Sequence, residues 1–380
     1  MGKLRVAHIM HSYLPMTQNW IYNQLAHNRA CKPYVLCQTL ENVKHFPLDN
    51  VHPVYTQTSL RSHIALQCAR VTARYFSSHH KRQLQQIRPD ILHAHFAFEA
   101  WRNFEAIRHA GRPLVISFYG NDVTKLWRRR VWKRRYSKLF EYAAAIMVEG
   151  SHMGACIASM GCPPQKIRVI KIGIDLARIR QKVAVADNVP VRILFVGLSR
   201  EKKGPAYAAE TFCCAARQCP NLELHIIGDG SNRPLVESIF ERNAIQSQVT
   251  MHGSVTVDKY YELLGSMDLC LTPSVTAKDG DTEGGAPVTA IEALACGVPV
   301  VGSTHCDIPN VVTHGKTGLL CDEKDVESLA HNLLTLATNT MMRSTFAKAG
   351  KQYAQQEHDI RVQTQKIADL YTSLRDNQNY

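Results

Sequence analysis

The 380-residue sequence lacks the features that mark several common classes of protein. No apolar run approaches the ~18 residues that a membrane-spanning helix needs. The chain goes directly into the short apolar stretch LRVAHIM, so we expect neither a spanning helix nor a signal peptide. The twelve cysteines lie singly or as one adjacent pair, and none forms a C-x-x-C pair. We therefore expect buried, reduced thiols in a cytosolic protein, rather than a disulfide framework or a zinc site.

Three familiar catalytic and cofactor-binding motifs are also missing. No G-x-G-x-x-G follows the first apolar stretch, which argues against a Rossmann dinucleotide cofactor. No G-x-x-x-x-G-K-[ST] is present, which argues against a P-loop ATPase, and no G-x-S-x-G indicates a hydrolase nucleophile. The sequence also has no internal repeat and no low-complexity segment.

The net charge of +13 is unevenly distributed. Residues 1–187 hold 28 Lys and Arg against 10 Asp and Glu, a net of +18, whereas residues 188–380 hold 17 against 22, a net of −5, and the two sum to +13. This asymmetry predicts an anionic partner for the first half, such as a membrane surface, a nucleic acid or a phosphorylated acceptor. No recognisable nucleic-acid-binding module is present, so we expect no nucleic acid partner.

Apolar stretches alternate with helical patterns along the chain, which predicts α/β architecture with parallel, doubly wound sheets. The predicted strands cover residues 4–10, 33–39, 90–96, 113–118, 143–149 and 167–172, and then 191–197, 222–228, 249–253, 269–273, 298–301 and 318–321. Helices are expected over residues 61–88, 101–110 and, as two helices, 341–374. The pattern pauses over residues 176–190, which predicts two domains, 1–185 and 186–355, followed by residues 356–380.

The segment 279–302, DGDTEGGAPVTAIEALACGVPVVG, carries the densest set of signals. Pro287 suits the first position of a helix, and Gly297 suits its left-handed stop. Two glycines before the helix leave backbone N–H groups free to bind an anion, helped by the helix dipole. Glu283 and Glu292 flank this site, and we expect them to bind neutral hydroxyl groups, as on a sugar. An ordinary βα turn with a satisfied buried glutamate explains the segment equally well, so both interpretations stay open.

A second anion signal lies in the loop after the predicted strand 191–197. Arg200, Lys202 and Lys203 in this loop, with the helix start at 284–287, could clamp a diphosphate whose negative charge grows as it leaves. A solvated basic loop is the plainer interpretation of these residues alone. Two anion signals in one domain favour the diphosphate site.

Together these motifs resemble the group 1 (family 4) retaining glycosyltransferases of GT-B fold. The resemblance is carried by Gly-x-x-x-x-Lys-Lys-Gly at 197–204, Gly-Asp-Gly at 228–230, Glu-Gly-Gly-Ala-Pro at 283–287 and Glu-Ala-Leu-Ala-Cys-Gly-Val-Pro-Val-Val at 292–301. It is most specific over residues 190–325. In the first half, HSYLPMTQNWIYNQL, DILHAHFAFEA, SFYGNDV and VIKIGID resemble the branch that builds colanic acid, other exopolysaccharides and the O-antigen of lipopolysaccharide.

The resemblance implies two Rossmann-like domains that face each other across a cleft, with the last helix crossing back to the first domain. It implies a retaining, metal-independent hexosyltransferase that uses a nucleotide sugar, UDP in preference to GDP, and no other cofactor. The acceptor would be a lipid-linked or phosphorylated glycan at the cytoplasmic face of the inner membrane.

The resemblance also assigns roles by position. Lys203 would contact the donor diphosphate, Glu283 would hydrogen-bond the hydroxyls of the transferred sugar, and Glu292 would accept the hydroxyls of the ribose. The other expected donor-binding residues are Gly197, Gly228, Gly230, His252, Gly253, Ser254, Gly284, Gly285, Ala286 and Pro287, with the loop around His252 at the edge of the base.

The sequence departs from the family pattern within the donor-binding motifs. The two glutamates are normally eight positions apart, whereas Glu283 and Glu292 are nine apart, which predicts one inserted residue near Gly284. The arginine that usually follows the strand glycine is replaced by Leu198, and Arg200 is the nearest candidate substitute.

A further departure lies in the first half. The family has a histidine in a His-Gly-x-Asp motif, and this position is Tyr119. Tyrosine can donate or accept a hydrogen bond but is a poorer proton acceptor at neutral pH. His95, at the end of its own predicted strand, is the alternative source of the polar group, and a satisfied core histidine is the plainer interpretation of His95.

Two further segments carry charge that invites interpretation. Asp279-Gly-Asp281 resembles a metal-binding Asp-x-Asp, but in this loop we expect turn chemistry and no metal. The segment 125–136 is basic at seven of twelve positions, with interleaved aromatic residues. A solvated helix face is the usual outcome of such a run, yet aromatic residues among basic ones also suit an anionic membrane surface. The predicted membrane or acceptor residues are Trp127, Arg128, Arg129, Arg130, Trp132, Lys133, Arg134 and Arg135.

We therefore expect a peripheral membrane glycosyltransferase of the cytoplasm. Two alternatives remain open at this point. One is another GT-B enzyme, either a transferase acting on a small soluble acceptor or a nucleotide-sugar epimerase. The other is a non-catalytic protein that binds a nucleotide sugar or a membrane surface.

Overall fold

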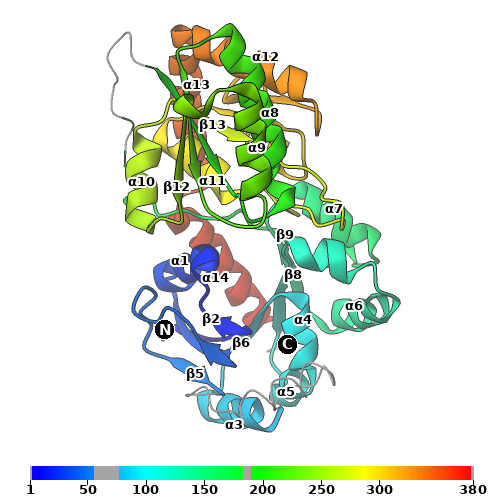
Figure 1. Ribbon diagram of the computed structural model, residues 1–380. Coiled ribbons are helices and arrows are strands. Elements are labelled where there is room, and N and C mark those ends of the chain that lie inside the picture. The colour runs from blue at the N-terminus through cyan, green and yellow to red at the C-terminus, as the bar shows by residue number, and fades with distance from the viewer. Residues whose placement is uncertain (1, 55–76, 181, 183–189, 378–380) are drawn as a thin grey trace. The chain divides into compact units, whose positions relative to one another are not determined.

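The structure is a computed structural model that describes residues 2–54, 77–180, 182 and 190–377. The chain divides into two compact units, one formed by Met1–Gly173 with Ile360–Tyr380 and the other by Ile174–Asp359. The divisions therefore fall at residues 173 and 359, whereas the sequence pattern places them at 185 and 355. Helices flank the sheet of each unit (Figure 1).

The first unit contains a seven-stranded parallel sheet with the order β5-β3-β1-β6-β7-β8-β9. Its strands are β1 (Leu4–Ile9), β3 (Cys31–Cys37), β5 (Val51–Pro53), β6 (Ile91–His95), β7 (Leu114–Ser117), β8 (Ala145–Val148) and β9 (Ile167–Val169). Its helices include α1 (Asn19–His27), α3 (Ser77–Ile87), α4 (Ala97–Arg102), α5 (Phe104–Ala110), α6 (Arg130–Tyr142), α7 (Ser151–Ser159) and α14 (Ile360–Asp376). A separate parallel pair joins β2 (Ser12–Tyr13) to β4 (Thr39–Leu40).

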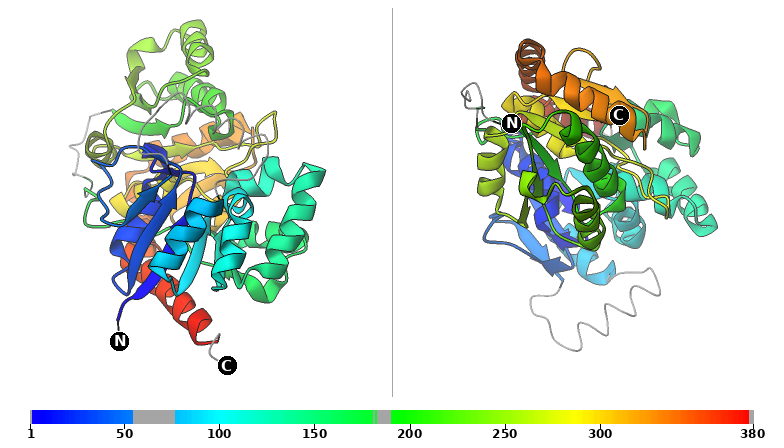
Figure 2. Two further views of the ribbon diagram at one scale, coloured as in Figure 1. Left: turned by 90° about the horizontal axis from the view of Figure 1, so that it is seen from below. Right: turned by 45° about the horizontal axis from the view of Figure 1, so that its top comes forward.

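The central strands of this sheet are buried because both of their faces are covered. β6, β7 and β8 are buried along their whole length, as is typical of parallel sheets. α14 is distant from these strands in the sequence but lies along one face of the sheet (Figure 2). Its residues Ile367, Leu370 and Tyr371 pack with Leu4 and Ile91 in one hydrophobic cluster, so the C-terminal helix is part of the first unit.

The second unit contains a six-stranded parallel sheet with the order β12-β11-β10-β13-β14-β15. Its strands are β10 (Val191–Val196), β11 (Leu222–Ile227), β12 (Val249–Gly253), β13 (Leu269–Thr272), β14 (Val300–Ser303) and β15 (Gly318–Cys321). Its helices include α8 (Pro205–Gln218), α9 (Arg233–Asn243), α10 (Val257–Gly265), α11 (Val288–Cys296), α12 (Val326–Thr338) and α13 (Thr340–Glu357). This strand order is that of a doubly wound Rossmann sheet, which confirms the predicted architecture.

Several helix predictions need correction in detail. The helix expected over 101–110 is interrupted at Asn103, whose Nδ2 donates a hydrogen bond to the carbonyl oxygen of Glu99 at 3.0 Å and so competes with the helical ladder. Of the helix expected over 61–88, residues 61–76 lie outside the described residues, and α3 covers the remainder to Ile87. Gly297 does end α11 in the left-handed conformation, with φ of 84°.

Candidate active site

The candidate donor residues lie at the carboxyl edge of the second sheet, where the strand order reverses between β10 and β13. Parallel α/β sheets bind ligands at such a point because the loops after the two strands diverge there. Lys203 lies in the loop after β10, and Ser274 lies in the loop after β13. Glu283 lies in the segment that leads into α11, and its carboxylate contacts both of these residues.

Lys203 and Glu283 form a largely buried ion pair. The Nζ of Lys203 lies 3.0 Å from Oε1 of Glu283 and 3.1 Å from Oε2. The hydroxyl of Ser274 donates to Oε1 at 3.0 Å. Burial by itself raises the pKa of Glu283, but the ammonium groups of Lys203 and Lys202 hold this pKa below its ordinary value. The Glu283 side chain, only 7% exposed, is therefore charged at neutral pH.

Two glycines allow Lys203 to reach this position. Gly197 has a φ of +135°, and a Cβ there would lie 2.6 Å from Cγ of Lys203. Gly204 has a φ of +69°, and a Cβ there would lie 1.9 Å from the carbonyl oxygen of Pro273. A larger residue at either position would force the Lys203 loop away from the strand ends that hold Ser274 and Glu283.

The other two cations of this loop have different partners. Lys202 donates to the carbonyl oxygen of Thr282 at 2.7 Å and lies 3.5 Å from Asp281. The Arg200 side chain is 65% exposed, and its guanidinium nitrogen Nη1 lies 3.8 Å from Oδ2 of Asp281. Asp279 accepts the backbone N–H of Asp281 at 2.9 Å, so the Asp-x-Asp segment forms an Asx-type turn.

The segment before α11 differs in two ways from the predicted anion site. Gly284 has a φ of 75°, and its N–H donates to Oγ1 of Thr282 at 3.1 Å, so the prediction that this amide is free is wrong. Pro287 is the N-cap residue of α11 and not its first helical residue, because its ψ of 130° is extended. Gly285 accepts the backbone N–H of Asp307 at 3.3 Å, which holds the Gly285–Ala286 segment beside the next loop.

Glu292 lies in α11 and is surrounded by tyrosine hydroxyls. The hydroxyl of Tyr260 donates to its Oε2 at 2.7 Å, and the hydroxyl of Tyr261 donates to its Oε1 at 2.9 Å. Burial raises the pKa of Glu292 to about 7, and these hydrogen bonds oppose the rise. Because a carboxylate has about four acceptor positions, Glu292 can still accept a ribose hydroxyl beside the two tyrosines.

The residues expected near the base lie at the ends of β11 and β12. Gly228 has a φ of 110°, and its N–H donates to the carbonyl oxygen of Gly253 at 2.8 Å. A Cβ at Gly230 would lie 2.6 Å from Cα of Ser199. His252 belongs to β12, not to a loop, and its Nε2 lies 3.0 Å from Nδ1 of His225. Ser254 follows the strand and is exposed.

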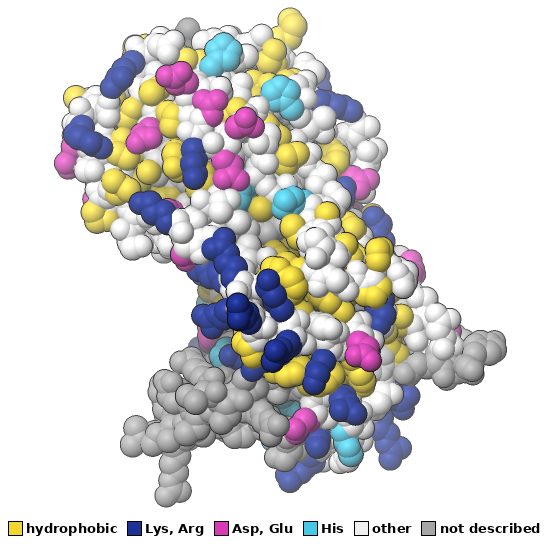
Figure 3. Space-filling model, turned by 90° about the vertical axis from the view of Figure 1, so that its right-hand side faces the viewer, with side chains coloured by type: hydrophobic (Ala, Val, Ile, Leu, Met, Phe, Trp, Pro, Cys, Tyr) yellow, Lys and Arg dark blue, Asp and Glu magenta, His cyan; other side chains and the backbone are white. Residues whose placement is uncertain are grey.

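The basic segment 125–136 runs from the end of a π-helical turn (Asp122–Leu126) into the first half of α6, and its aromatic residues do not form an exposed surface. Trp132 is 7% exposed and Tyr136 is fully buried, because the helical period places both on the buried face of α6. Trp127 precedes the helix and is half-buried against the same hydrophobic cluster. The predicted membrane contact through Trp132 is therefore wrong. The exposed residues are Arg128, Arg129, Arg130, Lys133 and Arg134, whereas Arg135 lies 4.7 Å from the ring centre of Trp132. Lys and Arg side chains gather on this side of the molecule (Figure 3).

No helix among the described residues is both long enough and apolar enough to cross a lipid bilayer. Eleven cysteines fall within the described part of the chain, and all eleven are free thiols.

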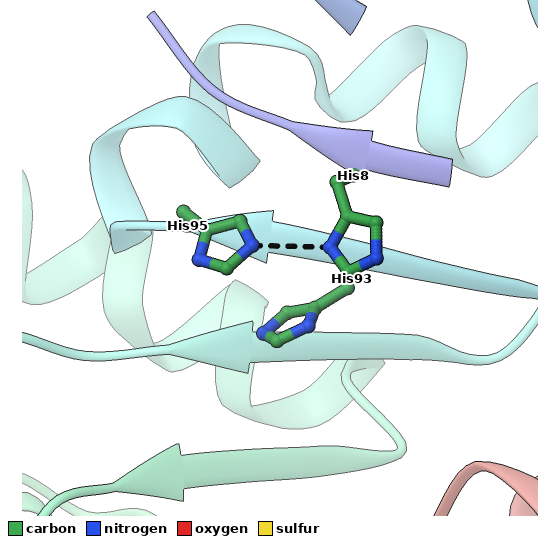
Figure 4. Close-up of side chains that lie close together, drawn as sticks. All are labelled: His8, His93 and His95. Carbon is green, nitrogen blue, oxygen red and sulfur yellow. Dashed lines mark hydrogen bonds between the residues drawn. The ribbon is translucent and has the colours of Figure 1, made fainter. Parts of the chain in front are cut away.

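In the first unit, Tyr119 and His95, the two candidates for the role of the family histidine, are hydrogen-bonded to each other. The Tyr119 hydroxyl lies 3.0 Å from Nδ1 of His95, and Nε2 of His95 lies 3.1 Å from Nδ1 of His8 (Figure 4). Burial lowers the pKa of His95 to about 3, so the imidazole is neutral at pH 7. The backbone N–H of Tyr119 donates to Asp122 at 3.1 Å, which fixes the start of the following turn.

His93 lies beside His8 and His95, but the three imidazole rings are not arranged to bind one metal ion. The ligand atoms of His8, His93 and His95 all lie within 4.8 Å of one another. However, both nitrogens of His93 contact hydroxyls, Ser117 at 2.7 Å and Tyr371 at 2.5 Å. The rings of His93 and His95 are stacked at 4.4 Å, so their in-plane lone pairs lie side by side and do not converge. The cluster is a hydrogen-bond network that satisfies buried imidazoles.

The Tyr119 end of this network opens on a pocket within the first unit. The pocket is lined by Trp20, Gln24, Tyr119, Met147, Glu149, Ile170, Lys171, Ile172, Gly173, Ile360, Gln363, Thr364 and Ile367. Among the described residues, Nε2 of the buried Gln24 has no hydrogen-bond partner. The lining therefore combines apolar side chains with polar groups that can bind the hydroxyl groups of a ligand.

The fold and the donor-type site together define a class of protein. The structure is similar to that of Anabaena Alr3699/HepE, solved in complex with UDP and glucose, with a TM-score of 0.76 and 19% sequence identity over 97% of this chain and 100% of that chain. It is also similar to sucrose-phosphate synthase from Thermosynechococcus elongatus, with a TM-score of 0.78 and 16% identity over 98% of this chain and 99% of that chain. The chain has the GT-B fold of the glycosyltransferases.

Sequence comparison assigns the family. Residues 190–339 match the model described as "Glycosyl transferases group 1", and residues 23–178 match "Glycosyltransferase Family 4". The chain is 30% identical to the amylovoran biosynthesis glycosyltransferase AmsK of Erwinia amylovora over 290 residues, 75% of this chain and 70% of AmsK. The chain belongs to the group 1, family 4 glycosyltransferases, as its motifs predict.

Four residues that contact the candidate site lie outside the motifs. Ser274 and His305 follow strand ends, and Tyr260 and Tyr261 form a pair in α10. The adjacent tyrosines are a usable signal, because buried tyrosine hydroxyls need acceptors and Glu292 is the buried acid opposite them. No comparable signal marks Ser274 or His305, since their roles depend on how separate loops meet.

Proposed function

We propose that this protein is a retaining hexosyltransferase that moves a sugar from a nucleotide sugar, with UDP as the nucleotide, to a lipid-linked or phosphorylated glycan. The observation that carries this proposal is the Lys203–Glu283 ion pair at the strand-order reversal of the second sheet. It places a cation and a charged hydrogen-bond acceptor within one small site. A diphosphate and a sugar present the matching groups.

The roles follow from charge. The ammonium of Lys203 would attract the donor diphosphate and stabilise the charge that grows on it as the glycosidic bond breaks. Glu283, which stays ionised beside Lys203 and Lys202, would accept hydrogen bonds from the sugar hydroxyls. A diphosphate that draws Lys203 away leaves Glu283 free to accept from the sugar instead.

In the proposed reaction, an acceptor hydroxyl oxygen bonds to the anomeric carbon on the face that the nucleotide leaves. The bond from the anomeric carbon to the β-phosphate oxygen breaks, and its electron pair stays on the departing nucleoside diphosphate. The acceptor proton passes to that phosphate oxygen, so no separate protein base is required. Attack on the same face retains the anomeric configuration.

Relatives support the choice of substrate class. AmsK is named for amylovoran biosynthesis, and WcaL of Salmonella typhimurium, assigned to colanic acid biosynthesis, is 29% identical over 74% of this chain and 70% of WcaL. HepE was solved with UDP and glucose. These findings favour polysaccharide synthesis and a UDP-linked donor.

The exposed cations of residues 128–134, at the start of α6 and just before it, support docking on an anionic membrane surface. Arg128, Arg129, Arg130, Lys133 and Arg134 are exposed, and each Lys or Arg near such a surface contributes roughly 1 kcal/mol. Because Trp132 is buried and Trp127 is half-buried, the proposed docking is mainly electrostatic. It would keep the enzyme at the cytoplasmic face of the inner membrane, where lipid-linked glycans are extended.

Two other functions make different predictions. A transferase for a small soluble acceptor, or an epimerase, would not bind anionic liposomes through α6. A non-catalytic binding protein would bind a nucleotide sugar without turnover. The pairing of Lys203 with a buried, charged Glu283 favours catalysis over binding alone.

A thermal-shift screen of nucleotide sugars tests the proposal, because a ligand stabilises the fold by RT ln(1 + [L]/Kd). UDP-sugars should raise the melting temperature of the wild type, and Lys203→Ala should reduce that shift while leaving the unliganded protein folded. Added EDTA should leave turnover unchanged. A wild type that is not stabilised by any nucleotide sugar contradicts the proposal.

A further inference from the structure

His305 and Glu323 together anchor the two ends of the loop 276–283, which contains Glu283. His305 follows β14 and its side chain is 1% exposed. Its Nε2 accepts the backbone N–H of Glu283 at 3.1 Å. Its Nδ1 lies 2.5 Å from Oε1 of Glu323, in the turn after β15. The imidazole therefore bridges the backbone of the candidate catalytic residue and a carboxylate.

Glu323 holds the other end of the same loop. Its Oε2 accepts the backbone N–H of Thr276 at 2.8 Å. One carboxylate and one imidazole thus fix residues 276 and 283, between which the chain turns at Asp279–Asp281. This loop leads directly to the extra residue that separates Glu283 from Glu292. A loop with both ends anchored can tolerate such an insertion without moving Glu283.

The hydrogen bonds determine the tautomer of His305. Glu323 can only accept a hydrogen bond, so Nδ1 must carry a proton, and the Glu283 N–H can only donate, so Nε2 must present a lone pair. Although burial raises the pKa of Glu323, hydrogen bonds from His305 and Thr276 hold it below its ordinary value. The neutral Nδ1–H imidazole therefore satisfies both the Glu323 carboxylate and the Glu283 N–H, and the Cys306 thiol, 3.2 Å from Nε2, can share the same lone pair as a weak donor.

We propose that His305 and Glu323 are positioning residues for sugar transfer, which clamp the loop 276–283 so that the Glu283 carboxylate faces Lys203. The proposal rests on the role of Glu283 given above, but the clamp itself is a property of the folded chain. Neither His305 nor Glu323 needs to touch the donor. Their effect is on the sugar end of the donor site, because they position Glu283, whose proposed role is to bind the sugar hydroxyls. His305 itself does not contact Lys203, whereas Glu283 does.

The first test measures the clamp without any substrate. Hydrogen–deuterium exchange of His305→Ala and Glu323→Ala should show faster exchange of the backbone amides of residues 276–284 than in the wild type. His331→Ala and Glu327→Ala on the exposed side of α12 are matched controls and should leave that exchange unchanged. Wild-type exchange in this segment for both His305→Ala and Glu323→Ala overturns the clamp, whatever the activity of the protein.

The second test separates positioning from general loss of structure. In His305→Ala, turnover of UDP-glucose should fall by up to about 100-fold, because displacement of a reacting group by about 1 Å can cost this much. Affinity for UDP alone should stay within about twofold, because UDP carries no sugar for Glu283. His305→Gln retains one donor and one acceptor, so it should restore part of the turnover.

The double variant His305→Ala/Glu323→Ala completes the test. If the two residues act as one clamp, the double variant should be no slower than the slower single variant. Additive losses, or an equal fall in the affinities for UDP and UDP-glucose, would overturn the proposal. A wild type without turnover of any nucleotide sugar would instead contradict the proposed function, and the exchange measurement would still decide the clamp.

Discussion

The two glutamates of the candidate donor site differ in charge because their neighbours differ. Glu283 lies beside two ammonium groups, which hold its pKa low despite burial. Glu292 accepts hydrogen bonds from two neutral tyrosines, and burial raises its pKa to about 7. Glu283 therefore keeps its charge at neutral pH, whereas Glu292 titrates close to neutral pH.

The raised pKa of Glu292 predicts a pH-dependent stability. Between its ordinary pKa of 4.5 and about 7, the native state keeps a proton that the unfolded chain has lost. The free energy of unfolding therefore falls as pH rises across this window, by on the order of 3 kcal/mol from this group. Glu292→Gln has no titrating group, so its stability should change less. Urea unfolding at pH 5 and pH 7 measures the difference, and equal pH dependence in both proteins contradicts the prediction.

Tyr119 predicts a second effect at the residue scale. Tyr119→Phe removes the hydroxyl that contacts Nδ1 of the buried His95, and an unsatisfied buried polar group costs about 1–3 kcal/mol. Urea unfolding should show a loss of this size. Tyr22→Phe is the control, because its hydroxyl makes an exposed bond to Pro47 at 3.3 Å and should cost less than about 0.5 kcal/mol. Equal stability of the two variants would show that the Tyr119–His95 bond contributes nothing.

At the scale of single elements, sequence patterns locate strands better than they place side chains. Apart from the short edge strand β5, the strands of both sheets follow from apolar stretches, because parallel strands with two covered faces are rich in apolar residues. The charge run of α6 was harder to interpret. Its composition predicts a membrane surface that includes tryptophan, whereas the helical period puts Trp132 in the core and leaves the cations outside. Periodicity, not composition, decides which side chains are available.

The exposed cations at the start of α6 and just before it lead to a prediction about membrane binding. Replacing Arg128, Arg129 and Arg130 with Gln should reduce binding to vesicles that contain anionic lipids, because each cation contributes roughly 1 kcal/mol. The effect should shrink as salt screens the charges. Flotation of the protein with such vesicles measures the binding.

A charge-matched control makes this prediction specific. Replacing Lys278, Lys316 and Lys324, which are exposed residues of the second unit, with Gln removes the same charge from elsewhere. This control should float as the wild type does. If both triple variants lose vesicle binding equally, the net charge of the protein is responsible for the binding, and not the cations at residues 128–130.

At the scale of the molecule, the motifs predicted two Rossmann-like sheets and the family, and both are confirmed. They could not predict the boundaries at 173 and 359, because these depend on which unit each flanking segment packs against. The contacts of Ser274, Tyr260 and His305 were equally hidden, since each joins loops that are distant in sequence. Local patterns define elements, whereas the site is made where their ends converge.

The proposed function depends most on the role of Glu283 in sugar transfer. The most direct measurement is turnover of UDP-sugars by the wild type with a lipid-linked glycan acceptor, followed by NMR of the anomeric configuration of the product. Wild-type enzyme should release UDP and form a product with retained configuration, and Glu283→Gln should be at least about 100-fold slower. A product with inverted configuration, or a Glu283→Gln variant as fast as the wild type, would contradict the account.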